Sequence, residues 1–336
     1  MIKVLHPGIF TTIQDLGRRC VQAYGVPLAG AMDEYSCKIA NLLAGNDEDT
    51  PLLELTMFGG SYEFLEDTIV AIAGAPMDAQ LGSKPLANWA SHIVKKGEQL
   101  SFSFATMGCR AYMAIAGGLA VEKIMGSVST HTRSKMGGLA GRSLQKGDIL
   151  PINKPCVFQE KSLPEIFQID FSKSPVIRIL PGPQHDFFVD DVFDELQKST
   201  YDIQPDSDRM GYRLLGTPLK HKKSADIISD ALFKGAVQVP GDGQPIIMLA
   251  DCQTTGGYTK LCFVITPDLD LLAQCKPGDK VKFLVVKEEK AYAIYEKYRK
   301  RLSDAKAYLE NVDNASCITL CINGVQYNVQ IKEMEV

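Results

Sequence analysis

Short apolar segments, each bounded by Gly, Pro, Asp or Lys, recur along most of the sequence. Segments of this length, rich in Val, Ile, Leu and Phe, are typical of β-strands. They do not alternate strictly with helical segments, which argues against a doubly wound parallel sheet. We therefore predict a mainly β protein. The predicted strands cover residues 68–73, 99–104, 112–116, 176–180, 246–250, 261–265 and 281–286.

Helical patterns are few. Asp33 can cap a helix that continues to Leu43, with Gly45 just past its end. A second helical spacing occurs over residues 188–196. The clearest pattern is an apolar stripe over residues 288–309, with charges of both signs between its members. It predicts a helix that packs onto a β-barrel of this chain or onto a partner. The final segment predicts a β-hairpin turning at Asn323-Gly324.

The chain has 336 residues, whereas single cores stop growing at about 250–300 residues, so two domains are expected. IVAIAGA and then KKGEQLSFSF in the first half are echoed by IIMLADCQTTGG and CKPGDKVKFLVV in the second. This weak repeat favours two related β-barrels. We predict a first domain over 1–155, a linker over 156–175, a second domain over 176–287 and an extension over 288–336.

Composition narrows the functional classes. A net charge of −4 provides no basic stripe for nucleic acid. No apolar run approaches the roughly 20 residues that span a bilayer, and MIKVLHPGIF lacks the features of a signal peptide, so a cytoplasmic location is expected. Nine scattered cysteines without a CxxC pair argue against a disulfide framework. The histidines lack ligand spacing with them, so no metal site is predicted.

The segment GAVQVPGDGQPIIMLADCQTTGGY, residues 235–258, is the most suggestive of a binding site. Its strand IIMLA is uniformly apolar and therefore predicted to be buried, and Asp251 follows directly. Polar groups that emerge from a buried strand are costly unless they are paired or used. A satisfied turn network and the wall of a polar small-molecule site explain the segment equally well. The candidate binding residues are Gln238, Asp242, Gln244, Asp251, Thr254 and Thr255.

Three further segments combine glycine turns with arginine. Arginine can bind a carboxylate or a phosphate through two parallel hydrogen bonds, although an ordinary surface pair is the commoner use of any one arginine. The chain contains no GxxxxGK[ST], no strand-linked GxGxxG, no GxSxG and no HExxH. The candidates from these segments are Gln14, Asp15 and Arg18, then Arg133 and Arg142, then Asp208 and Arg209.

An ordered set of motifs covers roughly residues 1–287. They include PGIFTTIQDLGR, YGVPLAGAMD, LELTMFGG, GSVSTHTR, GGLAGRSLQKGD, LPGPQ, SDRMGYRL and the 235–258 segment. On these motifs the chain resembles the biotin-dependent carboxyltransferase-like family. That family includes the 5-oxoprolinase C subunits, the Kip-type antagonists, the allophanate hydrolase subunit 2-like proteins and, as a relative, the carboxyltransferase domain of urea carboxylase. The resemblance implies two tandem cyclophilin-like β-barrel subdomains with the active site between them.

The resemblance also implies a function and partners. In the 5-oxoprolinase form, the C subunit acts with the B subunit and uses ATP with Mg²⁺ to phosphorylate 5-oxo-L-proline, and ring opening to L-glutamate is then completed by a third subunit. Asp208, Asp251 and Arg209 would then be catalytic. The arginines would hold phosphate or carboxylate, and Asp251 or Asp208 would be the general base or would accept the lactam N–H.

Two alternatives stay open at this point. One is biotin-dependent carboxyl transfer to urea or a similar amide, with biotin carried by another protein, because this chain has no Ala-Met-Lys-Met site. The other is a non-catalytic antagonist of a kinase inhibitor. The carboxyltransferase alternative keeps the same cleft and changes the reaction, whereas the antagonist would need only a binding surface.

Overall fold

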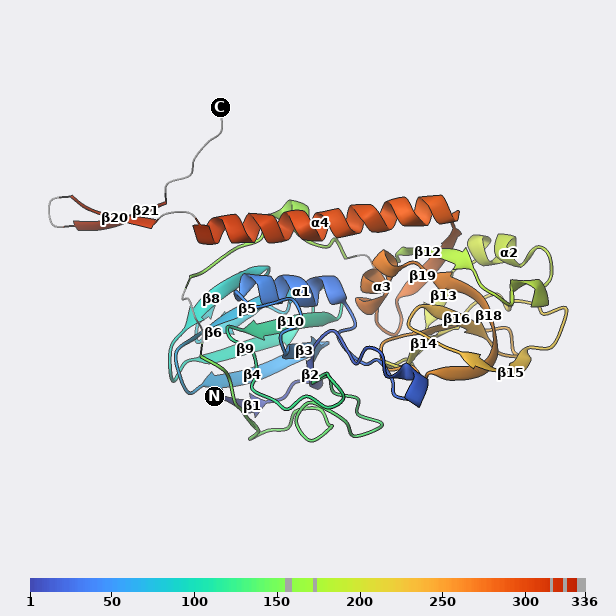
Figure 1. Ribbon diagram of the computed structural model, residues 1–336, viewed down its shortest axis with the longest axis horizontal. Helices are drawn as coiled ribbons and strands as arrows, with labels where there is room; N and C mark the ends of the chain where they lie inside the picture. The colour runs from blue at the N-terminus through green and yellow to red at the C-terminus, as the bar shows by residue number, and fades with distance from the viewer. Residues whose placement is uncertain (155–158, 172–173, 315–316, 323–324, 331–336) are drawn as a thin grey trace, which may run out of the picture.

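The computed structural model describes residues 1–154, 159–171, 174–314, 317–322 and 325–330. Two β-rich bodies lie side by side, and one long helix crosses over both (Figure 1). The mainly β prediction is confirmed, and each of the seven predicted strands has a counterpart. The helices and strands form over the apolar segments of the sequence, because each segment buries one face against a neighbouring layer.

The first body consists of two antiparallel sheets. One has the strand order β11-β1-β4-β9-β6-β7 and the other β2-β3-β10-β5-β8. Val4, Ile13, Leu53 and Phe64 come from both sheets and share one core, so the sheets pack face to face. The strands are β1 (Ile2–His6), β2 (Phe10–Gln14), β3 (Leu52–Thr56), β4 (Phe58–Phe64), β5 (Thr68–Gly74), β6 (Gln80–Leu81), β7 (Lys84–Pro85), β8 (Ala90–Val94), β9 (Gln99–Phe104), β10 (Arg110–Ile115) and β11 (Ile149–Leu150).

The second body is a closed barrel of seven strands in the order β12-β19-β13-β14-β17-β16-β18, with β12 pairing β18 to complete the circle. β15 pairs the outer part of β18 and lies outside the closed ring. The predicted barrel is therefore present here, whereas the first body forms two packed sheets. The strands are β12 (Val176–Pro181), β13 (Tyr201–Ile203), β14 (Gly211–Leu215), β15 (Asp226–Ala231), β16 (Ala236–Val239), β17 (Ile246–Met248), β18 (Thr255–Val264) and β19 (Lys280–Val285).

Helix α1 (Glu34–Leu43) begins as predicted, because the Asp33 side chain accepts a hydrogen bond from the Ser36 backbone N–H at 2.9 Å. It contacts β5 and β10 on one side and helix α4 on the other. The remaining helices are α2 (Val192–Lys198), α3 (Thr266–Ala273), α4 (Glu288–Asn314) and the 3-10 turns η1 (Gln22–Tyr24), η2 (Glu165–Phe167) and η3 (His185–Phe187).

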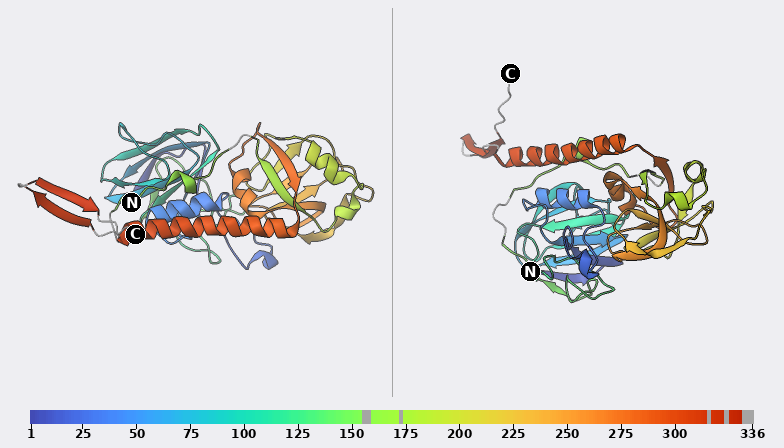
Figure 2. Two further views of the ribbon diagram at one scale, coloured as in Figure 1. Left: turned by 90° about the horizontal axis from the view of Figure 1, so that it is seen from above. Right: turned by 45° about the vertical axis from the view of Figure 1, so that its right-hand side comes forward.

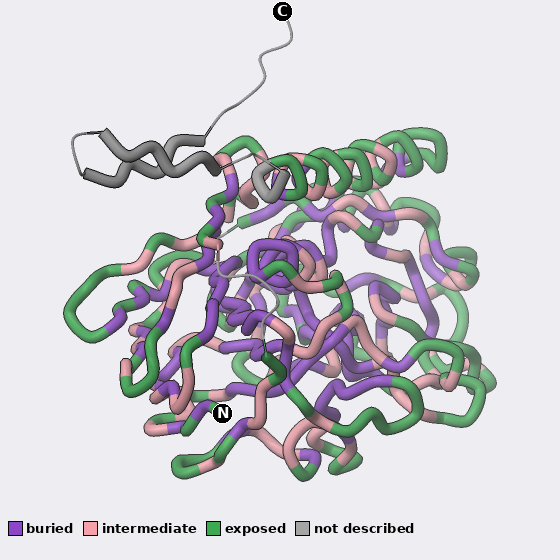
Figure 3. Tube along the Cα trace, turned by 60° about the vertical axis from the view of Figure 1, so that its left-hand side comes forward, coloured by how far each residue is buried: buried purple, intermediate pink, exposed green. Residues whose placement is uncertain are grey.

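Helix α4 confirms the predicted C-terminal helix and its packing stripe. Ala305 and Leu309 are buried in a cluster with α1, whereas Ala291 packs near the barrel. The helix therefore spans both bodies, as the view from above shows (Figure 2). Its outer surface is mostly exposed (Figure 3).

Beyond α4, strands β20 (Cys317–Ile322) and β21 (Val325–Gln330) pair as an antiparallel hairpin, as predicted. The expected turn residues Asn323 and Gly324 lie outside the described residues, as do 156–158 and 172–173 of the expected linker.

Candidate functional site

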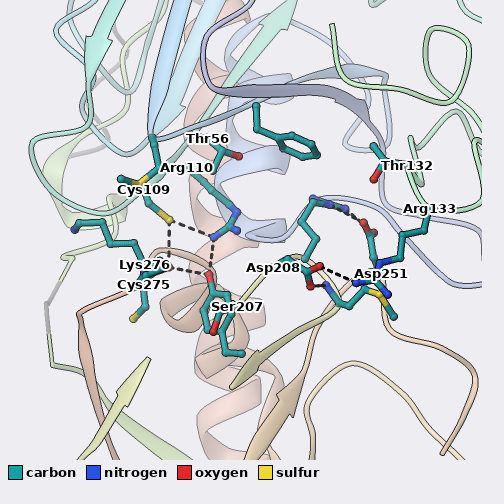
Figure 4. Close-up of a pocket in the computed structure, with 16 residues that line it drawn as sticks. Thr56, Cys109, Arg110, Thr132, Arg133, Ser207, Asp208, Asp251, Cys275 and Lys276 are labelled. Atoms are coloured by element: carbon teal, nitrogen blue, oxygen red, sulfur yellow. Dashed lines mark hydrogen bonds and ion pairs between the residues drawn. The ribbon is translucent and has the colours of Figure 1, made fainter. Parts of the chain in front are cut away.

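A cavity of about 330 Å³ lies where the two bodies meet. On one side its walls come from the start of β2, the end of β3, the start of β10 and the loop after β10. On the other side they come from β14 and the loops around residues 208, 251 and 276. Figure 4 shows Arg110 and Lys276 across the cavity from Asp208 and Asp251. The lining residues are Phe10, Thr56, Met57, Cys109, Arg110, Thr132, Arg133, Ser207, Asp208, Arg209, Met210, Tyr212, Asp251, Cys275, Lys276 and Pro277.

A buried ionic network forms part of the cavity wall and joins the two bodies. Arg209 donates two hydrogen bonds to Asp251, from Nε to Oδ2 and from Nη2 to Oδ1, both at 2.9 Å. Its Nη1 donates to Glu54 Oε1 of the first body at 2.5 Å. Burial alone would lower the pKa of Arg209, but Asp251 and Glu54 outweigh it and raise that pKa above its ordinary value.

Glu54 is fully buried and has further partners. It accepts hydrogen bonds from the Met32 backbone N–H at 2.8 Å and from the Tyr112 hydroxyl at 2.9 Å. Burial opposes its ionisation, yet Arg209 and Arg110 outweigh burial and hold its pKa below the ordinary value. The carboxylate is therefore charged at neutral pH and fixes the position of the arginine opposite it.

The turn around Gly30 completes the Arg209 site. The Gly30 carbonyl accepts a hydrogen bond from Arg209 Nη2 at 2.6 Å. Gly30 has a φ of +89°, and a Cβ there would lie 2.8 Å from the Gly17 nitrogen. Only glycine allows this close approach with a positive φ, so the turn that presents the carbonyl depends on it.

Arg110 forms a second fixed cation in the cavity wall. Its Nη1 donates to the Tyr212 hydroxyl at 2.8 Å and to the Ala273 carbonyl. Gln274 binds the start of β10, because its Oε1 accepts hydrogen bonds from the Cys109 and Arg110 backbone N–H groups at 3.2 and 3.0 Å. Its Nε2 donates to Asp33 at 2.7 Å. One side chain of the second body therefore holds two elements of the first.

The rim of the cavity carries more accessible charges. Arg133 and Asp208 lie 3.4 Å apart (Nη2 to Oδ2), and their side chains are 66% and 51% exposed. Lys276 is half-buried and lies 3.5 Å from Asp279. An exposed pair such as Arg133–Asp208 is worth little, so these two side chains can exchange partners for a ligand.

Two buried polar atoms in the lining residues have no hydrogen-bond partner among the described residues. They are Thr56 Oγ1 and Arg110 Nε. Unsatisfied buried polar atoms are rare in folded proteins, and a ligand or an ordered water can supply the missing partner. Together with the accessible rim charges, they mark this cavity as the best candidate for a polar ligand.

A family model described as "Carboxyltransferase domain, subdomain A and B" matches residues 24–285. This chain belongs to that carboxyltransferase domain family. The match covers the barrel, the first body apart from β1 and β2, and the whole cavity lining except Phe10. The family resemblance expected from the sequence motifs is thereby confirmed.

Relatives of this carboxyltransferase-domain chain fall into two groups. It is 37% identical over 291 residues to the 5-oxoprolinase C subunit of Escherichia coli (strain K12), covering 87% of this chain and 93% of that protein. It is 34% identical over 316 residues to urea amidolyase of Saccharomyces cerevisiae, covering 88% of this chain but 17% of that protein. The crystal structure of the K. lactis urea amidolyase superposes with a TM-score of 0.86 at 30% identity, covering 90% of this chain and 20% of that one.

Four of the residues selected from the sequence meet at the cavity of this carboxyltransferase domain. Arg133 and Asp208 form the rim pair, and Arg209 and Asp251 form the buried pair. Of the 235–258 segment, Asp251 is the one residue that lines the cavity. The polar cavity wall predicted for residues 235–258 therefore consists of the Asp251 carboxylate alone among the described residues.

The other candidates of the first body lie outside the cavity lining and bond to neighbouring protein groups, although Gln14 Oε1 and Arg18 Nη1 are buried with no hydrogen-bond partner among the described residues. Gln14 donates to the Thr12 hydroxyl at 2.9 Å, and Asp15 accepts from the Ser127 hydroxyl at 2.6 Å and the Val128 backbone N–H at 2.7 Å. Arg18 is fully buried and donates to two backbone carbonyls, and burial lowers its pKa. Arg142 forms a bidentate pair with Asp148, both bonds at 2.8 Å.

The other candidates of the barrel also lie outside the cavity lining. Gln238 donates to the Tyr258 carbonyl at 3.2 Å, and Asp242 caps the Gln244 backbone N–H at 3.0 Å. Gln244 bonds both backbone groups of Gly216, at 2.9 and 3.2 Å. Thr254 and Thr255 lead into β18, where Thr255 pairs Ala231. Gln238, Asp242 and Gln244 thus form a satisfied turn network, which was the other interpretation of the segment.

Sequence reasoning missed Glu54, Arg110, Tyr212, Gln274 and Lys276. A signal existed for two of them, because Glu54 and Arg110 are single charges within otherwise apolar strand segments, LLELT and RAYMAI. A lone charge on a buried strand is costly unless a partner is supplied from elsewhere in the fold. Only the tertiary structure shows where that partner lies.

Across the described part of the chain, no group of three or more His, Cys, Asp or Glu residues could hold a metal ion. No helix among the described residues is both long and apolar enough to cross a membrane.

Proposed function

We propose that this chain is the C subunit of an ATP-dependent 5-oxoprolinase. It would act with a homologue of the B subunit to phosphorylate 5-oxo-L-proline, and ring opening to L-glutamate would be completed by a third subunit. The observation that carries the proposal is the 37% identity that extends over 93% of the Escherichia coli 5-oxoprolinase C subunit. The accessible cations at the cavity support it.

The cavity suits the chemistry of this substrate. A lactam carbonyl is a poor electrophile, and ATP would supply the phosphoryl group that turns its oxygen into a leaving group. Arg133 and Lys276 are placed to bind an anionic group at the rim. A volume of about 330 Å³ is at the small end of ordinary ligand sites, which favours a compact substrate and a nucleotide shared with the partner protein.

The geometry suggests different roles for the two aspartates. Both oxygens of Asp251 already accept hydrogen bonds from Arg209, so we assign Asp251 to positioning that guanidinium. Asp208 is half-exposed, and its partners among the described residues are Arg133 and the Met210 backbone N–H, which leaves it able to accept the lactam N–H. Arg133 would bind the substrate carboxylate, and Arg209 would stabilise charge that develops on the amide oxygen.

Mg²⁺ would arrive with the nucleotide, because the described residues offer no cluster of three candidate ligands. A cytoplasmic location is part of the proposal, since ATP is available there. The same compartment keeps thiols reduced, and six cysteines are free in the described part of the chain.

Co-expression with the neighbouring B-type partner tests the proposal. The purified complex is expected to hydrolyse ATP at a rate that rises when 5-oxo-L-proline is added, and the isolated chain is expected to be inactive. An ATPase rate that no lactam alters would refute the proposal. Binding of the partner without any turnover would favour the antagonist alternative.

Biotin-dependent carboxyl transfer is the second candidate. It is favoured by the 34% identity to the Saccharomyces cerevisiae urea amidolyase, although this chain spans only 17% of that protein. The reaction would need bicarbonate and a biotin carrier from another protein. Urea-dependent ATP turnover that avidin abolishes would select this candidate over the first.

A further inference from the structure

A second cavity, of about 350 Å³, lies beneath helix α4. It is bounded by α1, α3, β12, α4 and residues 169–170, and none of its lining residues lines the cavity between the two bodies. Helix α4 begins at Glu288, beyond the family match that ends at residue 285. The second cavity therefore depends on a helix that is not part of the matched domain.

Two cations of α4 face this cavity without a carboxylate partner. Lys297 and Arg301 are one helical turn apart, and no ion pair joins either to a described residue, whereas Arg178 is already paired with Asp268. Arg301 donates to the Gln168 carbonyl, but its Nε is buried and has no partner among the described residues. A half-buried guanidinium with one buried donor left unpaired favours an anionic acceptor.

The carboxylates of the cavity do not cancel this charge. Asp170 is exposed. Asp270 is buried and accepts from the Glu34 backbone N–H and the Tyr298 hydroxyl, both at 2.8 Å. Burial and the nearby Asp33 raise the pKa of Asp270 to about 8, against the lowering effect of Lys234. Both oxygens of Asp270 accept hydrogen bonds from protein donors, and no ion pair joins this carboxyl to Lys297 or Arg301 among the described residues.

The other walls are largely apolar or aromatic. Tyr35 and Tyr298 lie with ring centroids 5.9 Å apart, and the Arg301 guanidinium lies 5.2 Å from the Tyr35 ring centroid. Leu271 and Ile294 add aliphatic surface. Such a lining is suited to a compact apolar body attached to an anionic head.

We propose that this cavity binds a small organic anion, a carboxylate or a phosphate ester with a compact apolar body. Arg301 and Lys297 contact the anionic head, and Tyr35 and Tyr298 contact the body. The site is separate from the cavity between the bodies, so the proposal is independent of the reaction assigned there.

Methyl NMR of the full chain tests the site with a matched set of probes. Benzoate and phenyl phosphate share a ring and differ in the anionic head, and benzyl alcohol is the neutral control. Saturable shifts of the Ile294 and Leu271 methyl signals with either anion are expected, and the more tightly bound anion identifies the head group. Met57 and Met210 report any binding in the cavity between the bodies.

Two substitutions on one helix complete the test. Lys297→Gln is expected to weaken anion binding about tenfold, the factor for one charge-assisted hydrogen bond. Lys300→Gln removes the same charge from an exposed position outside the cavity lining and is expected to leave binding unchanged. The proposal is overturned by the absence of saturable shifts, by equal shifts with benzyl alcohol, or by equal weakening in both variants.

Discussion

Arg209 and Glu54, which are 155 positions apart in the chain, form a buried ion pair between the barrel and the first body. Asp251 holds the other edge of the same guanidinium. Arg209 is therefore one of the side chains that fix the orientation of the two bodies, beside Arg110 and Gln274. This relationship gives the first prediction.

Replacing Arg209 with Ala is expected to destabilise the protein by about 3–5 kcal/mol, the usual cost of leaving buried charges without a partner. Glu54 and Asp251 would both lose a charged partner. Urea unfolding measures the effect. Arg213→Ala is the control, because Arg213 pairs with Asp206 on the surface, and a loss of similar size there would contradict the assignment.

Replacing Arg133 with Ala is expected to change substrate binding and leave stability nearly unaltered. Its side chain is 66% exposed, so the free energy of unfolding should change by about 0.5 kcal/mol or less. In the reconstituted complex, KM for 5-oxo-L-proline should rise about tenfold, the loss of one charge-assisted hydrogen bond. Arg142→Ala, at the Asp148 pair away from the cavity, should leave KM unchanged.

Acid is expected to destabilise the protein through Glu54. Its folded-state pKa lies below the ordinary value of 4.5. The stabilisation is therefore fully present above that value and is lost as pH falls through the folded-state pKa. Urea unfolding between pH 6 and pH 3 should show a smaller acid loss in Glu54→Gln than in the parent. Parallel curves for the two proteins would contradict this role.

The pH dependence of stability that comes from Asp270 is expected to have the opposite sign to that from Glu54. Its folded-state pKa of about 8 exceeds the ordinary 3.8, so the folded protein retains a proton that the unfolded chain releases. The contribution of this proton to the free energy of unfolding is greatest below pH 3.8, declines as pH rises and is gone above about pH 8. Asp270→Asn should flatten the stability profile between pH 5 and pH 8. Asp33, Glu34, Lys234 and Tyr298 surround this group, and an unchanged slope would assign the dependence to them.

Much of the fold could be predicted because its signals are local. The strand 99–104 and the Asp33 cap appear at the predicted positions, since apolar runs and cap residues act within a few positions. The closure of β12 onto β18 had no local signal. The two-sheet form of the first body likewise depends on which strand edges pair, which periodicity does not encode.

The candidate site was likewise predictable only where its signals are local. The sequence by itself determined which segments carry unusual polar groups, and it identified Arg133, Asp208, Arg209 and Asp251 among them. It could not separate these from Gln14, Asp15 or Gln244, because a polar side chain beside a glycine turn looks the same whether it caps its own loop or faces a ligand. Only the tertiary structure decided this, by bringing Glu54 and Arg110 of the first body against the barrel, since a buried charge is defined by partners distant in the chain.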